Sequence, residues 1–150
     1  MPIEHEIDHK RRLVVAKGRG VLTKSDVLEY QRGVWSRAEV AGYDELMNMS
    51  DVEEIDLPSL ESVRELAQLS AAMDADAPPS RFAIVAPKDF AFALGRLYEA
   101  HRSLDERSRK AVNVFRKLEE ALACYKKSDC LVEEKTCCAP MMAPEPAAKF

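Results

Sequence analysis

The chain has 150 residues, of which 47% are apolar and 32% are charged, and its formal net charge is −4. This length and composition are typical of a single folded domain that buries a core without needing disulfides or metal. The negative net charge does not indicate a basic surface for binding nucleic acid. No apolar stretch approaches the roughly 20 residues of a membrane-spanning helix.

The N-terminal segment predicts a β-hairpin. Apolar and polar residues alternate in IEHEID (residues 3–8), as in a half-exposed strand, and the polar HKRR then turns the chain. LVVAKGRG (residues 13–20) follows as a second strand, and we expect Gly18 and Gly20 to end it.

The first helix has a clear start signal. Thr23 and Asp26 have the spacing of a capping box, and Leu22 and Val27 are placed as a hydrophobic staple. Trp35 lies on the apolar stripe that follows, and we favour a core position over a ligand site for it. The stripe comprises Val27, Tyr30, Val34, Trp35 and Ala38.

The rest of the domain alternates strands with helices. Strands are predicted at residues 43–49, 81–86 and 111–115, and helices at 60–73, 87–101 and 116–123. An acidic loop is expected between residue 49 and the helix at 60. The order strand–strand–helix–strand–helix–strand–helix–strand–helix predicts an α/β domain with a mixed, mostly parallel five-stranded sheet and helices packed on it.

The last 25 residues differ in composition from the domain. Apolar periodicity fails from residue 126, so we assign residues 1–125 to a single domain and 126–150 to a flexible tail rich in Cys, Pro and Met. The four cysteines, whose role the sequence does not define, are Cys124, Cys130, Cys137 and Cys138. Their clustering predicts reduced thiols, and the charged N-terminus MPIEHEIDHKRR lacks the apolar stretch of a signal peptide, so a cytoplasmic location is expected.

Catalytic and metal-binding patterns are missing from the sequence. It contains no Gly-x-Ser-x-Gly, His-Glu-x-x-His or phosphate-loop motif, and the cysteine spacing does not match a zinc site. We therefore expect a protein that is not an enzyme and needs no cofactor or metal.

The segment ELMNMSDVEEIDLPSLESVRELA and the closing NVFRKLEEALA resemble the STAS domain family of anti-sigma factor antagonists, especially its SpoIIAA-like members. The resemblance covers about residues 3–125. It implies a STAS-like fold and a regulatory module that binds a protein partner, and it leaves a homodimer open. Neither nucleic acid nor a membrane span is implied.

The family's switch loop is altered in this chain. Asp56 falls on the family's Asp, whereas Leu57 and Pro58 take the places of two hydroxyl residues, the second of which is phosphorylated in the antagonists. The usual phosphoserine switch is therefore expected to be missing. A partner-binding loop would contain Asp56, Ser59 and Ser62, and we favour Ser59 as a helix N-cap over a phosphorylation site.

An alternative function comes from Sec14-like lipid carriers, which use a similar fold. The helix that begins at Pro87 would then line a site for a small apolar ligand or lipid, with Phe92 and Tyr98 as contacts. Its competing interpretation is a plain helix-on-sheet core. Phe90 and Phe92 cannot share one helix face, so one of them should be more exposed than the other.

Overall fold

The computed structural model describes residues 2–130 of the chain, with side chains up to residue 125. Its strands and helices follow the predicted order. In sequence they are β1 (Ile3–Asp8), β2 (Leu13–Thr23), α1 (Lys24–Trp35), a short 3-10 helix η1 (Ala38–Val40), β3 (Asp44–Asp56), α2 (Glu61–Asp74), β4 (Ser80–Val85), α3 (Asp89–Leu104), β5 (Lys110–Phe115) and α4 (Leu118–Cys130).

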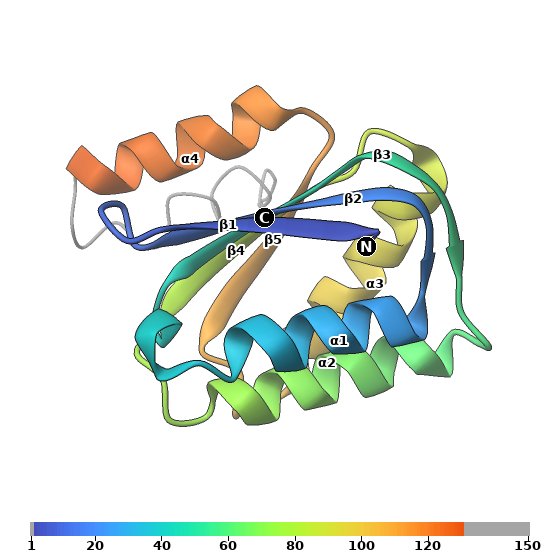
Figure 1. Ribbon diagram of the computed structural model, residues 1–150, viewed down its shortest axis with the longest axis horizontal. Coiled ribbons are helices and arrows are strands. Elements are labelled where there is room, and N and C mark those ends of the chain that lie inside the picture. The colour runs from blue at the N-terminus through green and yellow to red at the C-terminus, as the bar shows by residue number, and fades with distance from the viewer. Residues whose placement is uncertain (1, 131–150) are drawn as a thin grey trace, which may run out of the picture.

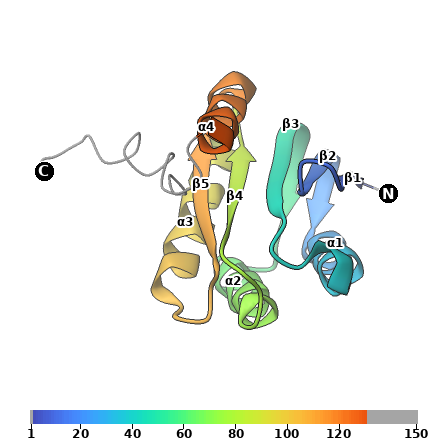
Figure 2. The same ribbon diagram turned by 90° about the vertical axis from the view of Figure 1, so that its left-hand side faces the viewer.

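The strands form one five-stranded sheet in the order β1-β2-β3-β4-β5, which is also their order in the chain (Figure 2). β1 pairs antiparallel with β2, and every later neighbour pairs in parallel. The predicted mixed, mostly parallel α/β sheet is therefore confirmed.

Helices cover both faces of the sheet. α4 lies on one face, and α1, α2 and α3 lie on the other (Figure 1). Every residue of β4 is buried, as expected for a central parallel strand that is covered on both faces. Successive residues of β3 enter different cores: Met47 packs on the three-helix side and Leu46 on the α4 side. No helix in residues 2–130 has the length and apolarity needed to cross a bilayer.

β2 and β3 extend beyond the rest of the sheet. β3 pairs with β2 as far as Asp56 but with β4 only at residues 45–48, so its second half has a partner on one side. The resulting two-stranded ribbon, residues 18–23 and 49–56, bends toward α1 and α2 (Figure 1). We call it the β2–β3 ribbon. Register shifts occur between Lys17 and Arg19 and between Gly20 and Val21.

The ribbon corrects two predictions. β2 does not end at Gly18 or Gly20 but continues to Thr23, because the strand accommodates both glycines at register shifts. Gly20 has φ +65°, which L side chains rarely adopt, and a Cβ at Gly18 would lie 2.9 Å from the Val52 side chain. The expected acidic loop after residue 49 is also wrong, since residues 49–56 complete β3.

The start of α2 differs from the expected cap. The residue before the helix is Leu60, and no side chain caps the helix there. Ser59 is exposed, and its backbone carbonyl, not its hydroxyl, accepts a hydrogen bond from the Ser62 N–H at 3.1 Å. The predicted side-chain cap by Ser59 is therefore wrong: the chain enters α2 through a turn closed by its own backbone.

The C-terminal helix reaches past the predicted domain boundary. α4 continues to Cys130, so the first five residues of the proposed tail are helical, whereas 131–150 lie outside the described residues.

Cys124 is fully buried and takes part in a disulfide bond. The expectation of reduced thiols is therefore wrong for this residue. Cys137 and Cys138 lie outside the described residues.

The capping box of α1 provides the first testable prediction. The Asp26 N–H donates to the Thr23 hydroxyl at 3.1 Å, and the Thr23 N–H donates to the Asp26 carboxylate at 2.9 Å. Thr23→Ala should lower the free energy of unfolding in urea by about 1 kcal/mol, because it leaves a helix N–H without a partner. Thr23→Ser is the matched control and should retain most of the stability. Equal stability of the Ala and Ser variants would contradict the assignment.

Candidate functional site

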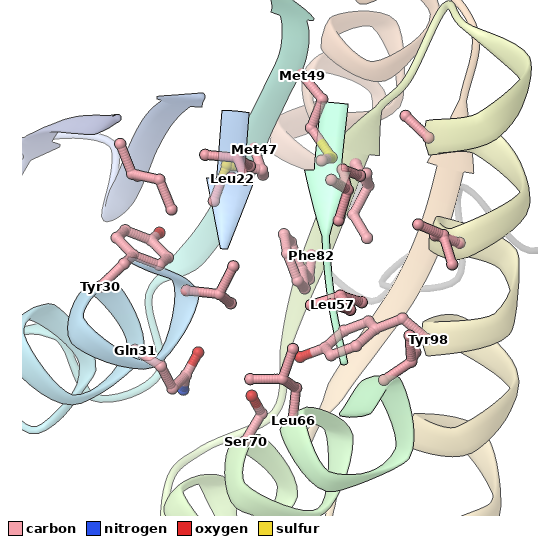
Figure 3. Close-up of a pocket in the computed structure, with 18 of the residues that line it drawn as sticks. Leu22, Tyr30, Gln31, Met47, Met49, Leu57, Leu66, Ser70, Phe82 and Tyr98 are labelled. Atoms are coloured by element: carbon pink, nitrogen blue, oxygen red, sulfur yellow. The ribbon is translucent and has the colours of Figure 1, made fainter. Parts of the chain in front are cut away.

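An apolar cavity of about 120 Å³ lies between the sheet and the three-helix layer (Figure 3). Its wall takes residues from β1 to β4, from α1 to α3 and from the segment before α2. The lining comprises Ile3, Leu22, Val27, Tyr30, Gln31, Glu45, Met47, Met49, Ile55, Leu57, Val63, Leu66, Ser70, Phe82, Ile84, Ala91, Leu94, Gly95 and Tyr98.

The cavity exists because the three helices do not lie equally close to the sheet. α1 packs on β1 and β2, α3 packs on β5 and β3, and α2 packs mainly on α3 and α1. Gly95 permits the close approach of α3, since a Cβ there would lie 3.2 Å from the Val114 side chain on β5. α2 therefore bridges its neighbours and leaves a space above β3 and β4.

The β2–β3 ribbon closes one end of this space. Leu22 and Ile55 from the ribbon, and Leu57 just beyond it, contribute to the wall. The ribbon is attached to the start of α3 by a hydrogen bond of 2.9 Å from Lys88 Nζ to the Val52 carbonyl. An ion pair between Lys24 and Glu65 joins α1 to α2.

The two ends of the cavity differ in polarity. In Figure 3 the side chains of Leu22, Met47 and Met49 lie at one end, and those of Gln31 and Ser70 lie at the other, where the Tyr98 hydroxyl also points inward. A ligand with one polar group therefore has a preferred orientation in the cavity.

Glu45 anchors a buried polar network beside the cavity. Lys110 Nζ donates to its Oε1 at 2.7 Å, and the Tyr30 hydroxyl donates to its Oε2 at 2.7 Å. The Trp35 indole N–H donates to the Tyr30 oxygen at 3.1 Å, and Lys110 Nζ lies 3.0 Å from the centroid of the Trp35 ring. Both Glu45 oxygens are thus occupied, and the carboxylate is not a free general base.

A second buried ion pair, between Arg102 and Asp74, supports the Tyr98 hydroxyl. Arg102, which is 2% exposed, forms an ion pair with Asp74, and its Nη1 donates to the Tyr98 hydroxyl at 2.7 Å. Its Nε donates to the Ser108 hydroxyl at 2.9 Å. The guanidinium therefore supports Tyr98 from behind the cavity wall.

Burial controls the ionisation of this region. It raises the pKa of Tyr30 well above its usual value, and the negative Glu45 adds to the effect. It raises the pKa of Tyr98 against the opposing influence of Arg102, and it lowers the pKa of Lys110 against the opposing influence of Glu45. The phenols therefore stay neutral at physiological pH.

The two predicted apolar contacts have different positions. Tyr98 lines the cavity, as the ligand hypothesis requires. Phe92 is partly buried against the core but does not line the cavity, and the Arg116 guanidinium lies 4.0 Å from its ring centroid. Phe90 is exposed, so the expected difference between these two phenylalanines is present. Trp35 packs against the core, as expected.

The three predicted loop residues do not share one surface. Asp56 is exposed at the end of β3, and Ser59 is exposed before α2. Ser62 is 2% exposed and buried in the first turn of α2, so it is not available to a partner. Leu60, which sequence reasoning did not select, is 66% exposed beside Ser59.

Most of the cavity wall was not predicted. Met47, Leu66 and Phe82 appear in sequence as ordinary core residues, and no pattern distinguishes a packed core from one with a gap. Glu45 offered little signal, because in sequence it follows Asp44 and looks like part of the polar start of the strand. Its partner Lys110 is 65 residues away, which local patterns do not reveal.

The buried phenols predict a pH dependence. Burial raises the pKa of Tyr30, Tyr98 and Tyr125, so the unfolded chain loses these protons first as pH rises. Their contribution to stability is therefore fully present below about pH 10 and is lost as the pH rises further. Near pH 11, the tyrosinate absorbance of the native protein should be well below that of the chain unfolded in urea. Tyr125→Phe should remove one of the tyrosines that ionise only at higher pH. Equal absorbance of native protein and unfolded chain would contradict the burial.

Comparisons of the sequence with models of known families and with curated proteins find no significant match. Structural comparison finds a similar fold in a crystal structure of an uncharacterized protein from the DUF3478 family of Shewanella loihica PV-4, which is described as having a SpoIIAA-like fold. The alignment covers 81% of this chain and 91% of that chain, with a TM-score of 0.52 and 15% sequence identity. The chain therefore has the SpoIIAA-like fold that its sequence resembles.

Proposed function

We propose that this protein is a binding module for a compact apolar small molecule, held in the cavity between the sheet and α1–α3. The observation that carries the proposal is the cavity itself. Protein interiors are packed as densely as organic crystals and contain few voids larger than a water molecule. A space of about 120 Å³ lined by Leu, Met, Ile and Phe side chains is therefore a feature that needs a reason.

The size of the cavity limits its ligand. An engineered cavity of about 150 Å³ with a similar apolar lining stays dry and binds benzene or xenon. Pockets for drug-sized molecules are larger, at about 300–1,000 Å³. The ligand is thus comparable to a single ring, or it inserts an apolar group of that size.

Binding rather than turnover is the proposed activity. Among the polar groups of the wall, the Glu45 oxygens are held by Tyr30 and Lys110, and the Tyr98 oxygen accepts from Arg102. These groups position one another and do not form a nucleophile–base pair. Reproducible turnover of an ester, phosphate or nucleotide that one point mutation abolishes would contradict this view.

A cavity-filling pair of variants tests the ligand proposal. Ala91 is 1% exposed and lines the cavity, whereas Ala93 is exposed on the same helix. Ala91→Leu should occupy the space and abolish the rise in melting temperature that toluene produces in the wild type. Ala93→Leu should bind toluene as the wild type does.

The stability of the Ala91→Leu variant provides a second readout. A well-packed core usually loses about 1–3 kcal/mol when extra methylenes are inserted, but a real cavity absorbs much of that cost. Calorimetric titration and thermal melting of the three proteins measure both effects. Identical toluene binding by Ala91→Leu and the wild type, or no binding by the wild type, would contradict the proposed function.

Protein docking at the start of α2 is a second candidate function, and the exposed Leu60 favours it. Leu60 is 66% exposed and lies next to the exposed Ser59. Leu57, three residues before Leu60, lines the cavity. This segment therefore connects the ligand space with the surface that matches the family's partner-binding loop.

Two substitutions test the docking candidate. Ser59→Ala should change the free energy of unfolding by less than about 0.5 kcal/mol, because the hydroxyl caps nothing and the site is exposed. Leu60→Glu should abolish co-purification of a protein partner from the native host, whereas Leu122→Glu, at a 38% exposed site on α4, should not. A loss near 1 kcal/mol in Ser59→Ala would restore the capping role. An unchanged set of partners with Leu60→Glu would exclude docking there.

A further inference from the structure

The polar end of the cavity defines the chemistry of the ligand, an inference that rests on the proposed function. We infer that the site selects an uncharged ligand with one hydrogen-bond-accepting group on a ring-sized apolar body, such as a phenol, and that it rejects the corresponding carboxylate. The Tyr98–Ser70 hydroxyl pair would recognise the polar group, while the Met47 and Met49 end of the cavity would hold the apolar body.

The Tyr98 hydroxyl has a proton to donate. Tyr98 and Ser70 both line the cavity at its polar end (Figure 3). The Tyr98 oxygen accepts from Arg102 Nη1 at 2.7 Å, which uses none of its own donor capacity. The phenolic proton can therefore be donated to a further acceptor. A ligand hydroxyl or carbonyl oxygen fits that donor.

Arg102 also fixes the direction of the donor. It is held by Asp74 and Ser108, so the Tyr98 oxygen has a rigid partner on the side away from the cavity. A preorganised donor loses little conformational freedom when a ligand binds. The hydroxyl is therefore suited to discriminating between ligands that differ by one polar group.

Among the residues that the structure describes, both cations near this end are already paired. Lys110 Nζ is bonded to Glu45 and lies over the Trp35 ring, and Arg102 is bonded to Asp74. The charges of Glu45, Asp74, Arg102 and Lys110 cancel in pairs. A ligand carboxylate would add a negative charge near Glu45, which is itself part of the wall, and burying an unpaired charge is strongly unfavourable.

A cationic ligand is disfavoured by the same pairing. Glu45 is the carboxylate that lines the cavity, and its two oxygens already accept from Tyr30 and Lys110. An ammonium group would have to displace one of these donors and leave it buried without a partner. An uncharged ligand can therefore bind without breaking any of the hydrogen bonds to Glu45.

Three molecules with the same methylbenzene body test the inference. We would measure the binding of toluene, para-cresol and para-toluate to the full chain by calorimetric titration near neutral pH. Para-cresol should bind about 2- to 12-fold more tightly than toluene, as expected for one added neutral hydrogen bond. Para-toluate should show no binding at the concentrations that saturate para-cresol.

Two variants locate the recognition at the hydroxyl pair. Tyr98→Phe removes the phenolic hydroxyl and should reduce the preference for para-cresol over toluene to about onefold. A cooperative thermal melt shows that each variant is folded. If Tyr98→Phe does not fold, Ser70→Ala provides the same comparison and should lower the preference as well.

The outcomes separate this inference from the proposed function. Binding of toluene with equal or tighter binding of para-toluate than para-cresol would overturn the neutral class and leave the apolar site intact. An unchanged para-cresol preference in every folded variant would overturn the role of the hydroxyl pair. Failure of both toluene and para-cresol to bind the wild type would overturn the proposed function and the inference together.

Discussion

The ion pair between Glu45 and Lys110 is the interaction on which the cavity depends. It joins β3 to β5 across β4, and through Tyr30 and Trp35 it also attaches α1 to the sheet. The pair is almost fully buried, and removing one partner from such a pair typically costs about 3–5 kcal/mol, because the other charge is left uncompensated. The pair thus holds a charged side chain in an otherwise apolar wall without leaving a charge free.

The arrangement of the helices explains why an apolar space can persist beside this network. α1 and α3 contact the sheet, α2 rests on both, and the β2–β3 ribbon closes the open end. A bound apolar ligand would cover this apolar lining and would stabilise the folded chain by mass action.

The sequence predicted the fold better than the site, and particular residues show why. Thr23 and Asp26 lie three residues apart and signal their helix locally, and the alternation of strands and helices is enough to predict a mostly parallel sheet. The ribbon was missed because Asp51, Glu53 and Glu54 look like loop residues, although a strand paired on one side can expose such side chains.

Tyr98 was the one predicted contact that lines the cavity. The Glu45–Lys110 pair joins residues far apart in the chain, and a gap in a core leaves no sequence pattern, so neither was predictable.

The space between α2 and the sheet is a persistent apolar pocket if the proposed function holds. A crystal of the protein held under xenon pressure tests this most directly, because xenon enters apolar cavities of this size without needing a polar partner. Xenon density bounded by Met47, Leu66 and Phe82 is expected in the wild type, and no such density is expected in Ala91→Leu. Xenon absent from this position in the wild type, or ordered water hydrogen-bonded there in its place, would contradict it.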